Sequence, residues 1–170
     1  DASVQEGIRI GEESGLRTIF SHYNLQGVHN YGRGNDGARF INEARERGVD
    51  VWAAHHPYTA TQSNLRSYAI PDWAAAGGQE GMVRRFDDTE ESARSAASTN
   101  AMLQIRGGAD KILFVDPRPE LNGRTLADVA AERELAPDEA VQAILRDGNA
   151  SVMNLELYDD ANTRRLAQEA

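Results

Sequence analysis

The apolar positions in the N-terminal part of the chain alternate between helical and strand-like spacing. Residues 3–14 and 38–47 each place small and apolar side chains on one helical face and are followed by a glycine, which predicts two helices. Short apolar runs at residues 16–22 and 49–54 follow these helices and predict two buried strands. Because a helix lies between them, the two strands are expected to be parallel and joined by a right-handed crossover.

The rest of the chain is less regular. Residues 23–37 and 59–79 are rich in glycine or proline and predict loops. The remaining expected elements are a helical stretch at 80–106, a buried strand at 111–115, a helix opened by Thr125, a helix with Pro137 in its first turn, a strand at 150–157 and a last helix capped by Asp159. The pattern as a whole predicts the α/β fold class.

Composition and charge argue against several classes of function for this chain. The chain has 27 acidic and 18 basic residues, a net charge of −9, which disfavours nucleic acid and anionic membranes as partners. Its hydrophobic content of 40% is ordinary for a soluble globular protein, and no apolar run approaches a membrane span. With no cysteine, disulfides and thiolate metal ligands are excluded. We expect a cytoplasmic protein that acts on a small molecule.

Histidines follow both N-terminal strands. His22 comes at the end of the first predicted strand, and His55 and His56 come at the end of the second. Sites in parallel α/β proteins lie at the carboxyl ends of strands, and neutral imidazole is a common zinc ligand. Since His55 and His56 alternate faces in an extended chain, at most one of them is expected to face such a site. A single strand-end histidine is also often a hydrogen-bonded structural residue, so position alone leaves both roles open.

Three stretches, in the order GIRIGEESGLRTIFSHYNLQG, VDVWAAHHPYTATQSNL and LNGRTLADVAAERELAPDEAVQAILRDGNASVMNLELYDDANTRRL, together resemble the N-acyl-D-amino-acid deacylases, or D-aminoacylases, of the amidohydrolase superfamily. The resemblance runs along nearly the whole chain. It implies a partial (β/α)₈ barrel with an α-rich inserted segment, zinc as cofactor, and hydrolysis of the amide of an N-acyl-D-amino acid. In this reaction a bound metal polarises the acyl carbonyl and lowers the pKa of a water molecule.

The resemblance also assigns roles to particular residues. His22 falls on the histidine of the family's "ISH" strand and is implied to be a metal ligand, and no catalytic residue is assigned within this chain. The substrate-binding positions implied are Asn24, His56, Tyr58, Gln62, Ser63 and Tyr158. Asn24 stands where a lysine often occurs and His56 stands where a tyrosine occurs, so the substrate itself stays open. An amidohydrolase relative acting on another, cyclic amide and a non-catalytic acidic interaction module remain alternatives.

The chain is shorter than the roughly 250 residues of a complete barrel. We therefore expect it to be a fragment, with barrel units at 1–65, a mostly helical insertion at 66–148, and a return strand and helix at 149–170. The isolated chain is expected to be catalytically inactive, to bind zinc weakly or not at all, and to self-associate through exposed strand edges.

Overall fold

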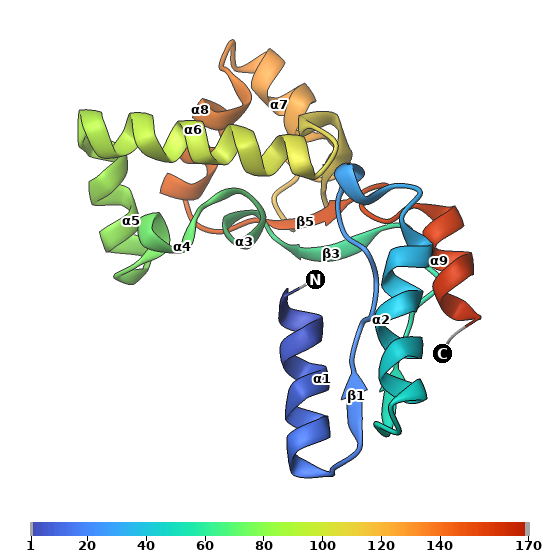
Figure 1. Ribbon diagram of the computed structural model, residues 1–170. Coiled ribbons are helices and arrows are strands. Elements are labelled where there is room, and N and C mark those ends of the chain that lie inside the picture. The colour runs from blue at the N-terminus through green and yellow to red at the C-terminus, as the bar shows by residue number, and fades with distance from the viewer. Residues whose placement is uncertain (1, 169–170) are drawn as a thin grey trace. The chain divides into compact units, whose positions relative to one another are not determined.

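The computed structural model describes residues 2–168, and its N-terminal part has the predicted order of helices and strands (Figure 1). By contacts, the chain divides into two units, one formed by both ends of the chain and one formed by residues 60–157. The first unit contains α1 (Ala2–Ser14), β1 (Thr18–Phe20), a 3₁₀ turn (Val28–Asn30), α2 (Gly34–Glu46), β2 (Val51–Ala53) and α9 (Asp160–Ala167). No described helix is both long and apolar enough to cross a membrane.

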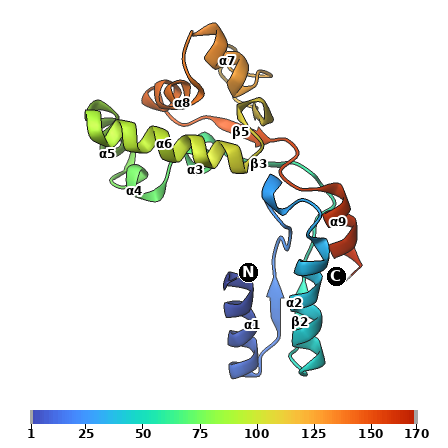
Figure 2. The same cartoon turned by 45° about the horizontal axis from the view of Figure 1, so that its top comes forward.

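In the first unit, β1 and β2 pair in parallel, which confirms the expected strand direction. Helices α1 and α2 flank this pair, and α9 lies beside α2 in both views (Figures 1 and 2). Gly11 allows α1 to approach β1, because a Cβ atom there would lie 2.3 Å from the Thr18 hydroxyl oxygen. The core between helices and sheet consists of Ile8, Ile41, Ala44, Val49 and Val51.

The first strand differs from the buried strand expected at 16–22. Only residues 18–20 pair with β2, and the side chains of Leu16 and Ile19 are 69% and 61% exposed. The reason is the alternation of side chains along a strand: helices cover one face, whereas Ile19 points to the other. Helix α2 also begins earlier than expected, at Gly34 inside the predicted loop, where a Cβ atom would lie 2.9 Å from Cβ of Arg165 on α9.

The second unit has a different architecture. Strand β5 is central and pairs antiparallel with both β3 and β4. The elements of this unit are β3 (Thr61–Asn64), α3 (Leu65–Ala69), α4 (Asp72–Ala75), α5 (Gly78–Asp87), α6 (Thr89–Ile105), a 3₁₀ turn (Ala109–Lys111), β4 (Ile112–Phe114), α7 (Leu126–Glu132), α8 (Pro137–Arg146) and β5 (Ser151–Asn154). Leu65, Met82, Phe114 and Leu145 are among its fully buried side chains.

Several expectations for this unit are confirmed, namely the helices at 80–106, the strand at 111–115, the two helices opened by Thr125 and by Pro137, and the strand within 150–157. The loop expected at 59–79 is wrong in part, because it contains β3, α3 and α4. The expected division into barrel units and an insertion, with boundaries at 65 and 148, stays a prediction. Pairing of β3 with β5 joins residues 61–64 and 151–154 to the helical segment, so β5 lies in the second unit.

Candidate metal and substrate site

His22 lies directly beyond β1, at a sharp change of backbone direction. Its φ of 54° is in the left-handed region, which is uncommon for a residue with a side chain. Pairing with the second strand continues on both sides of this residue, because Ala54 N donates to Phe20 O and Tyr23 N donates to Ala54 O, each at 2.8 Å. The left-handed turn therefore leaves the imidazole exposed at the carboxyl end of the strand pair.

The Tyr23 side chain fixes this turn to helix α2. Its hydroxyl donates to the carbonyl oxygen of Gly37 at 2.8 Å, and its ring packs against Phe20 with centroids 5.7 Å apart. Burial raises the pKa of Tyr23 to about 12, so the phenol stays protonated and remains a donor. His22 is thus preceded and followed by anchored residues.

His55 and His56 follow β2, and their rings stack with centroids 6.1 Å apart and planes inclined by 7°. His55 Nδ1 lies 3.2 Å from the carbonyl oxygen of Tyr23. A proton on Nδ1 satisfies this contact and leaves a lone pair on Nε2, which is buried and has no hydrogen-bond partner among the described residues. This is the arrangement in which a histidine is oriented for a metal ion by a backbone carbonyl.

His56 is the centre of an aromatic cluster in the first unit. Its ring centroid lies 6.1 Å from that of His22, 5.9 Å from that of Tyr58 and 4.9 Å from that of Tyr158. Burial lowers the pKa of His56, and the charges of His55 and His22 act in the same direction. A lowered pKa favours the neutral imidazole, which is the form that binds metals.

A cavity of about 520 Å³ adjoins His22. Its lining includes His22, Asn24, His29 and Arg33, and it is closed on other sides by the first turns of α1 and α2. Asn24 is held by its amide nitrogen, which donates to the backbone oxygen of His56 at 3.4 Å, while its buried Oδ1 has no partner in the part of the chain described. Imidazole, amide and guanidinium groups therefore share one cavity that can take a polar small molecule.

The structure brings five of the seven predicted site residues into the first unit, namely His22, Asn24, His56, Tyr58 and Tyr158. Gln62 and Ser63 lie on β3 of the second unit. Gln62 Nε2 donates to the Ser151 hydroxyl at 3.2 Å, and the Ser63 hydroxyl lies 3.1 Å from that of Ser67. The roles of all seven in metal or substrate binding stay predictions.

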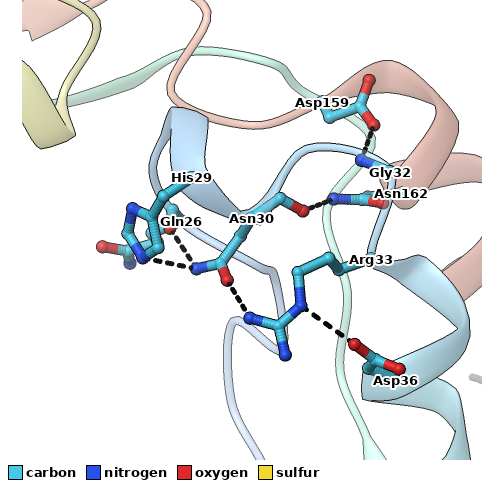
Figure 3. A network of polar contacts seen from close by, with 8 residues as sticks. All are labelled: Gln26, His29, Asn30, Gly32, Arg33, Asp36, Asp159 and Asn162. Carbon is cyan, nitrogen blue, oxygen red and sulfur yellow. Dashed lines mark hydrogen bonds and ion pairs between the residues drawn. The ribbon is translucent and has the colours of Figure 1, made fainter.

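The sequence left open which of His55 and His56 would face the site, and it gave no sign of the polar network around Asn30 shown in Figure 3. His55 differs from its neighbour only in its position along the chain, so no pattern distinguished the two. Asn162, which donates to the backbone oxygen of Asn30, lies on α9 more than 100 positions away, and no spacing rule connects the two.

The donor atoms of the cluster fit a metal site in part. His22 is exposed, and the buried atoms Nε2 of His55 and Nδ1 of His56 lack hydrogen-bond partners within residues 2–168. Zinc sites have three or four protein ligands. In the same range no group of three histidine, cysteine, aspartate or glutamate side chains is placed to hold a metal ion. The cluster therefore offers some imidazole ligands but not a complete coordination sphere.

The chain has a mixed α/β fold with His22, His55 and His56 beyond a pair of parallel strands, and strand ends of this kind are where α/β proteins commonly bind ligands. No protein-family profile matches the chain. The chain is 26% identical over 132 residues to the D-aminoacylase of Alcaligenes xylosoxydans xylosoxydans, covering 78% of this chain and 20% of that protein. It is 28% identical over 164 residues to the N-acyl-D-aspartate deacylase of the same organism, covering 96% of this chain and 25% of the relative.

Among solved structures, the N-acyl-D-glutamate deacylase of Bordetella bronchiseptica, crystallised with zinc and a phosphonate inhibitor, matches with a TM-score of 0.63 at 25% identity. The match covers 98% of this chain and 27% of that structure. The resemblance to N-acyl-D-amino-acid deacylases is thereby confirmed in sequence and in fold, and the alternative of an unrelated interaction module is not favoured. The chain spans about a fifth to a quarter of the length of these relatives.

Proposed function

We propose that this chain forms part of a zinc-dependent hydrolase that cleaves the amide bond of N-acyl-D-amino acids to a D-amino acid and a carboxylate. The observation that carries the proposal is the placement of His22 and His56 at the carboxyl ends of two neighbouring parallel strands, with ring centroids 6.1 Å apart. The similar proteins described above are named as deacylases of N-acyl-D-amino acids.

The proposal includes a finer view of the fold, in which the first unit is a portion of a (β/α)₈ barrel. The parallel pair β1–β2 with α2 between its strands in sequence supports this view, because βα units of this kind build such barrels. In a barrel, the carboxyl ends of the strands form the face that carries the active site. His22, His55 and His56 follow β1 and β2, so in such a barrel they would lie at this face.

His22 would hold the zinc ion, and the unpartnered nitrogen atoms of His55 and His56 make these residues the proposed further donors. A zinc ion bound there would polarise the acyl carbonyl of the substrate and lower the pKa of a water molecule. The remaining ligands and the general base are not assigned to this chain.

Around that centre, the chain's own side chains would bind and orient the substrate. Asn24 Oδ1 is free to accept a hydrogen bond, and the rings of Tyr58 and Tyr158 form apolar walls against His56. Because Oδ1 only accepts and Nδ2 already donates to His56 O, the free atom of Asn24 suits a substrate N–H or O–H group, and Asn24 supplies no positive charge for a carboxylate. Gln62 and Ser63 remain proposed substrate-binding residues on the basis of the family resemblance.

The test uses the complete gene product that carries this chain, loaded with zinc and offered N-acyl-D-amino acids, their L-enantiomers and cyclic amides. We expect release of the free amino acid from the D-substrates, with slower or no release from the other two classes. Turnover of cyclic amides alone, or of none of the three classes, would contradict the proposal.

A further inference from the structure

The loop between β1 and α2 forms much of the wall of the cavity beside His22, yet its conformation depends on contacts far away in sequence. The loop contributes Gln26, His29, Asn30 and Arg33 to the cavity lining. Val28 and Tyr31 are 39% and 41% exposed, so burial of apolar surface holds the loop only in part. Polar contacts also hold the loop, and Figure 3 shows that two of them lead to Asp159 and Asn162 at the start of α9.

Asp159 joins the start of α9 to this loop through one carboxylate. Its Oδ1 accepts from Ala161 N at 3.3 Å and caps α9, while its Oδ2 accepts from Gly32 N at 2.9 Å (Figure 3). Gly32 has a φ of 76°, a conformation that glycine adopts more readily than other residues. A hydrogen bond to an ionised acceptor is stronger than one between neutral groups.

Asn162 makes the second link, one turn further along α9. Its side chain is only 3% exposed, and Nδ2 donates to the backbone oxygen of Asn30 at 2.7 Å. Asn30 in turn donates from Nδ2 to Gln26 O at 2.8 Å and accepts at Oδ1 from Arg33 Nη1 at 2.9 Å. One buried amide thus orients a residue that contacts two other members of the cavity wall.

The residue before these anchors belongs to the aromatic cluster. Tyr158 is 5% exposed, forms an isolated antiparallel bridge with Gln26, and packs its ring edge against His56. The short segment 158–162 therefore contacts both the histidine cluster and the cavity loop, although it lies about 130 positions from the loop in sequence.

We propose that Asp159 and Asn162 are positioning residues that hold the loop at residues 26–33 in the shape needed to bind substrate in the cavity beside His22. The inference rests on the proposed function, since it assigns the cavity to the deacylase substrate. Neither side chain lines the cavity, so their effect on substrate is transmitted through Gly32 and Asn30.

The test compares Asp159→Ser with Asp160→Ser in the complete gene product. Serine is an N-cap about as good as aspartate, so α9 keeps its cap, but its shorter side chain does not reach Gly32. Asp160 is exposed and pairs with Arg164 rather than with the loop, so Asp160→Ser removes the same charge as a matched control. Asn162→Ala removes the other anchor independently.

Hydrogen–deuterium exchange of a peptide covering residues 26–33 reports directly on how firmly Asp159 and Asn162 hold the loop. Steady-state kinetics report on substrate binding. For Asp159→Ser and Asn162→Ala we expect exchange about tenfold faster, which corresponds to loss of one net hydrogen bond of about 1.4 kcal/mol. We also expect KM to rise about tenfold with kcat within about twofold, the signature of lost binding energy. If the substitutions only reduced the fraction of folded protein, the amount of active enzyme would fall and KM would stay unchanged.

The outcomes separate the inference from the proposed function. Unchanged exchange in both variants, or faster exchange with unchanged KM, would overturn the positioning role. If the parent protein shows no deacylase turnover, the proposed function fails, and with it the assignment of the cavity to this substrate. An equal change in Asp160→Ser would attribute the effect to charge and also refute the inference.

Discussion

Single residues of this chain show how a buried charge is stabilised when it is not part of a site. Asp116 in the second unit is 6% exposed, and its carboxylate accepts from Arg118 Nε at 2.7 Å and from Ser151 N at 2.8 Å. The hydrogen bond from Arg118 is the largest cause that holds the pKa of Asp116 at about 2. The carboxylate therefore joins the segment after β4 to the start of β5.

The lowered pKa of Asp116 predicts a defined loss of stability in acid. Because its pKa is lower in the folded state than in the unfolded state, its contribution is complete above about pH 4 and disappears as pH falls through about 2. We expect about 2 kcal/mol of unfolding free energy to depend on this group. Urea unfolding between pH 2 and 5 would measure it. Asp116→Asn should be less stable at neutral pH and less sensitive to acid, whereas Asp72→Asn, at an exposed position, should follow the parent.

Among single residues, the sequence predicts the histidines of the candidate site but not the groups that contact them. His22 could be found because it follows an apolar strand, and His56 was distinguished from His55 only by the family resemblance. The φ of 54° at His22, the unpartnered Nε2 of His55 and the contact of Asn162 with Asn30 depend on tertiary structure, so no local pattern reports them.

Among the elements, helices with strong local signals match their predictions best. Helix α7 begins with a capping box in which Thr125 Oγ1 accepts from Asp128 N at 3.1 Å, and Asp128 Oδ2 accepts from Thr125 N at 2.9 Å. Leu126 and Val129 then face the core of the second unit. Both the cap and the apolar spacing are visible in sequence, so the start of this helix could be predicted.

Removal of this cap should weaken the second unit by a limited amount. Thr125→Ala is expected to lower the free energy of unfolding by about 1 kcal/mol, because the N–H of Asp128 loses its acceptor. Thr125→Ser keeps a hydroxyl at the same place and should stay within about 0.5 kcal/mol of the parent. Denaturant unfolding of the three proteins checks this, and equal stability of Thr125→Ala and the parent would contradict the role given to the capping box.

Strand β3 illustrates why other elements escaped prediction. Its sequence, TQSN, has no apolar residue and therefore no alternation. It forms a strand because Thr61–Asn64 pair with Ser151–Asn154, which lie about 90 positions away. The early start of α2 has a similar origin, since Gly34 and Gly37 are helical where they pack against α9.

At the scale of the whole molecule, the β1–β2 pair leaves an apolar face uncovered within residues 2–168. Ile19 and Trp52 are register partners across the two strands, and their side chains are 61% and 47% exposed. No third strand joins this pair in the described part of the chain. Open strand edges and an apolar sheet face favour association with other strands.

We therefore expect the isolated 170-residue chain to form dimers or larger assemblies at micromolar concentration. Replacing both exposed partners, as Ile19→Lys with Trp52→Glu, should shift it toward monomer, because charges on this face oppose burial. Ile105→Lys changes an exposed apolar side chain of the second unit and serves as the control. Sedimentation velocity would test this, and a monomeric parent chain would refute it.

The incomplete ligand set also leads us to expect that the isolated chain has no deacylase turnover and retains zinc weakly, since residues 2–168 gather no three ligand side chains. Detectable turnover by the isolated chain would contradict this expectation. Exhaustive dialysis followed by metal analysis and a deacylase assay of the same sample would measure both properties.

The most direct test of the account is the zinc content of the complete gene product before and after His22→Asn, with His29→Asn as the control for loss of an exposed imidazole. We predict that the parent and His29→Asn retain zinc, and that His22→Asn loses most of it because one imidazole ligand is gone. Retention of both zinc and turnover in His22→Asn would contradict the assignment of His22 as a metal ligand and the site built around it.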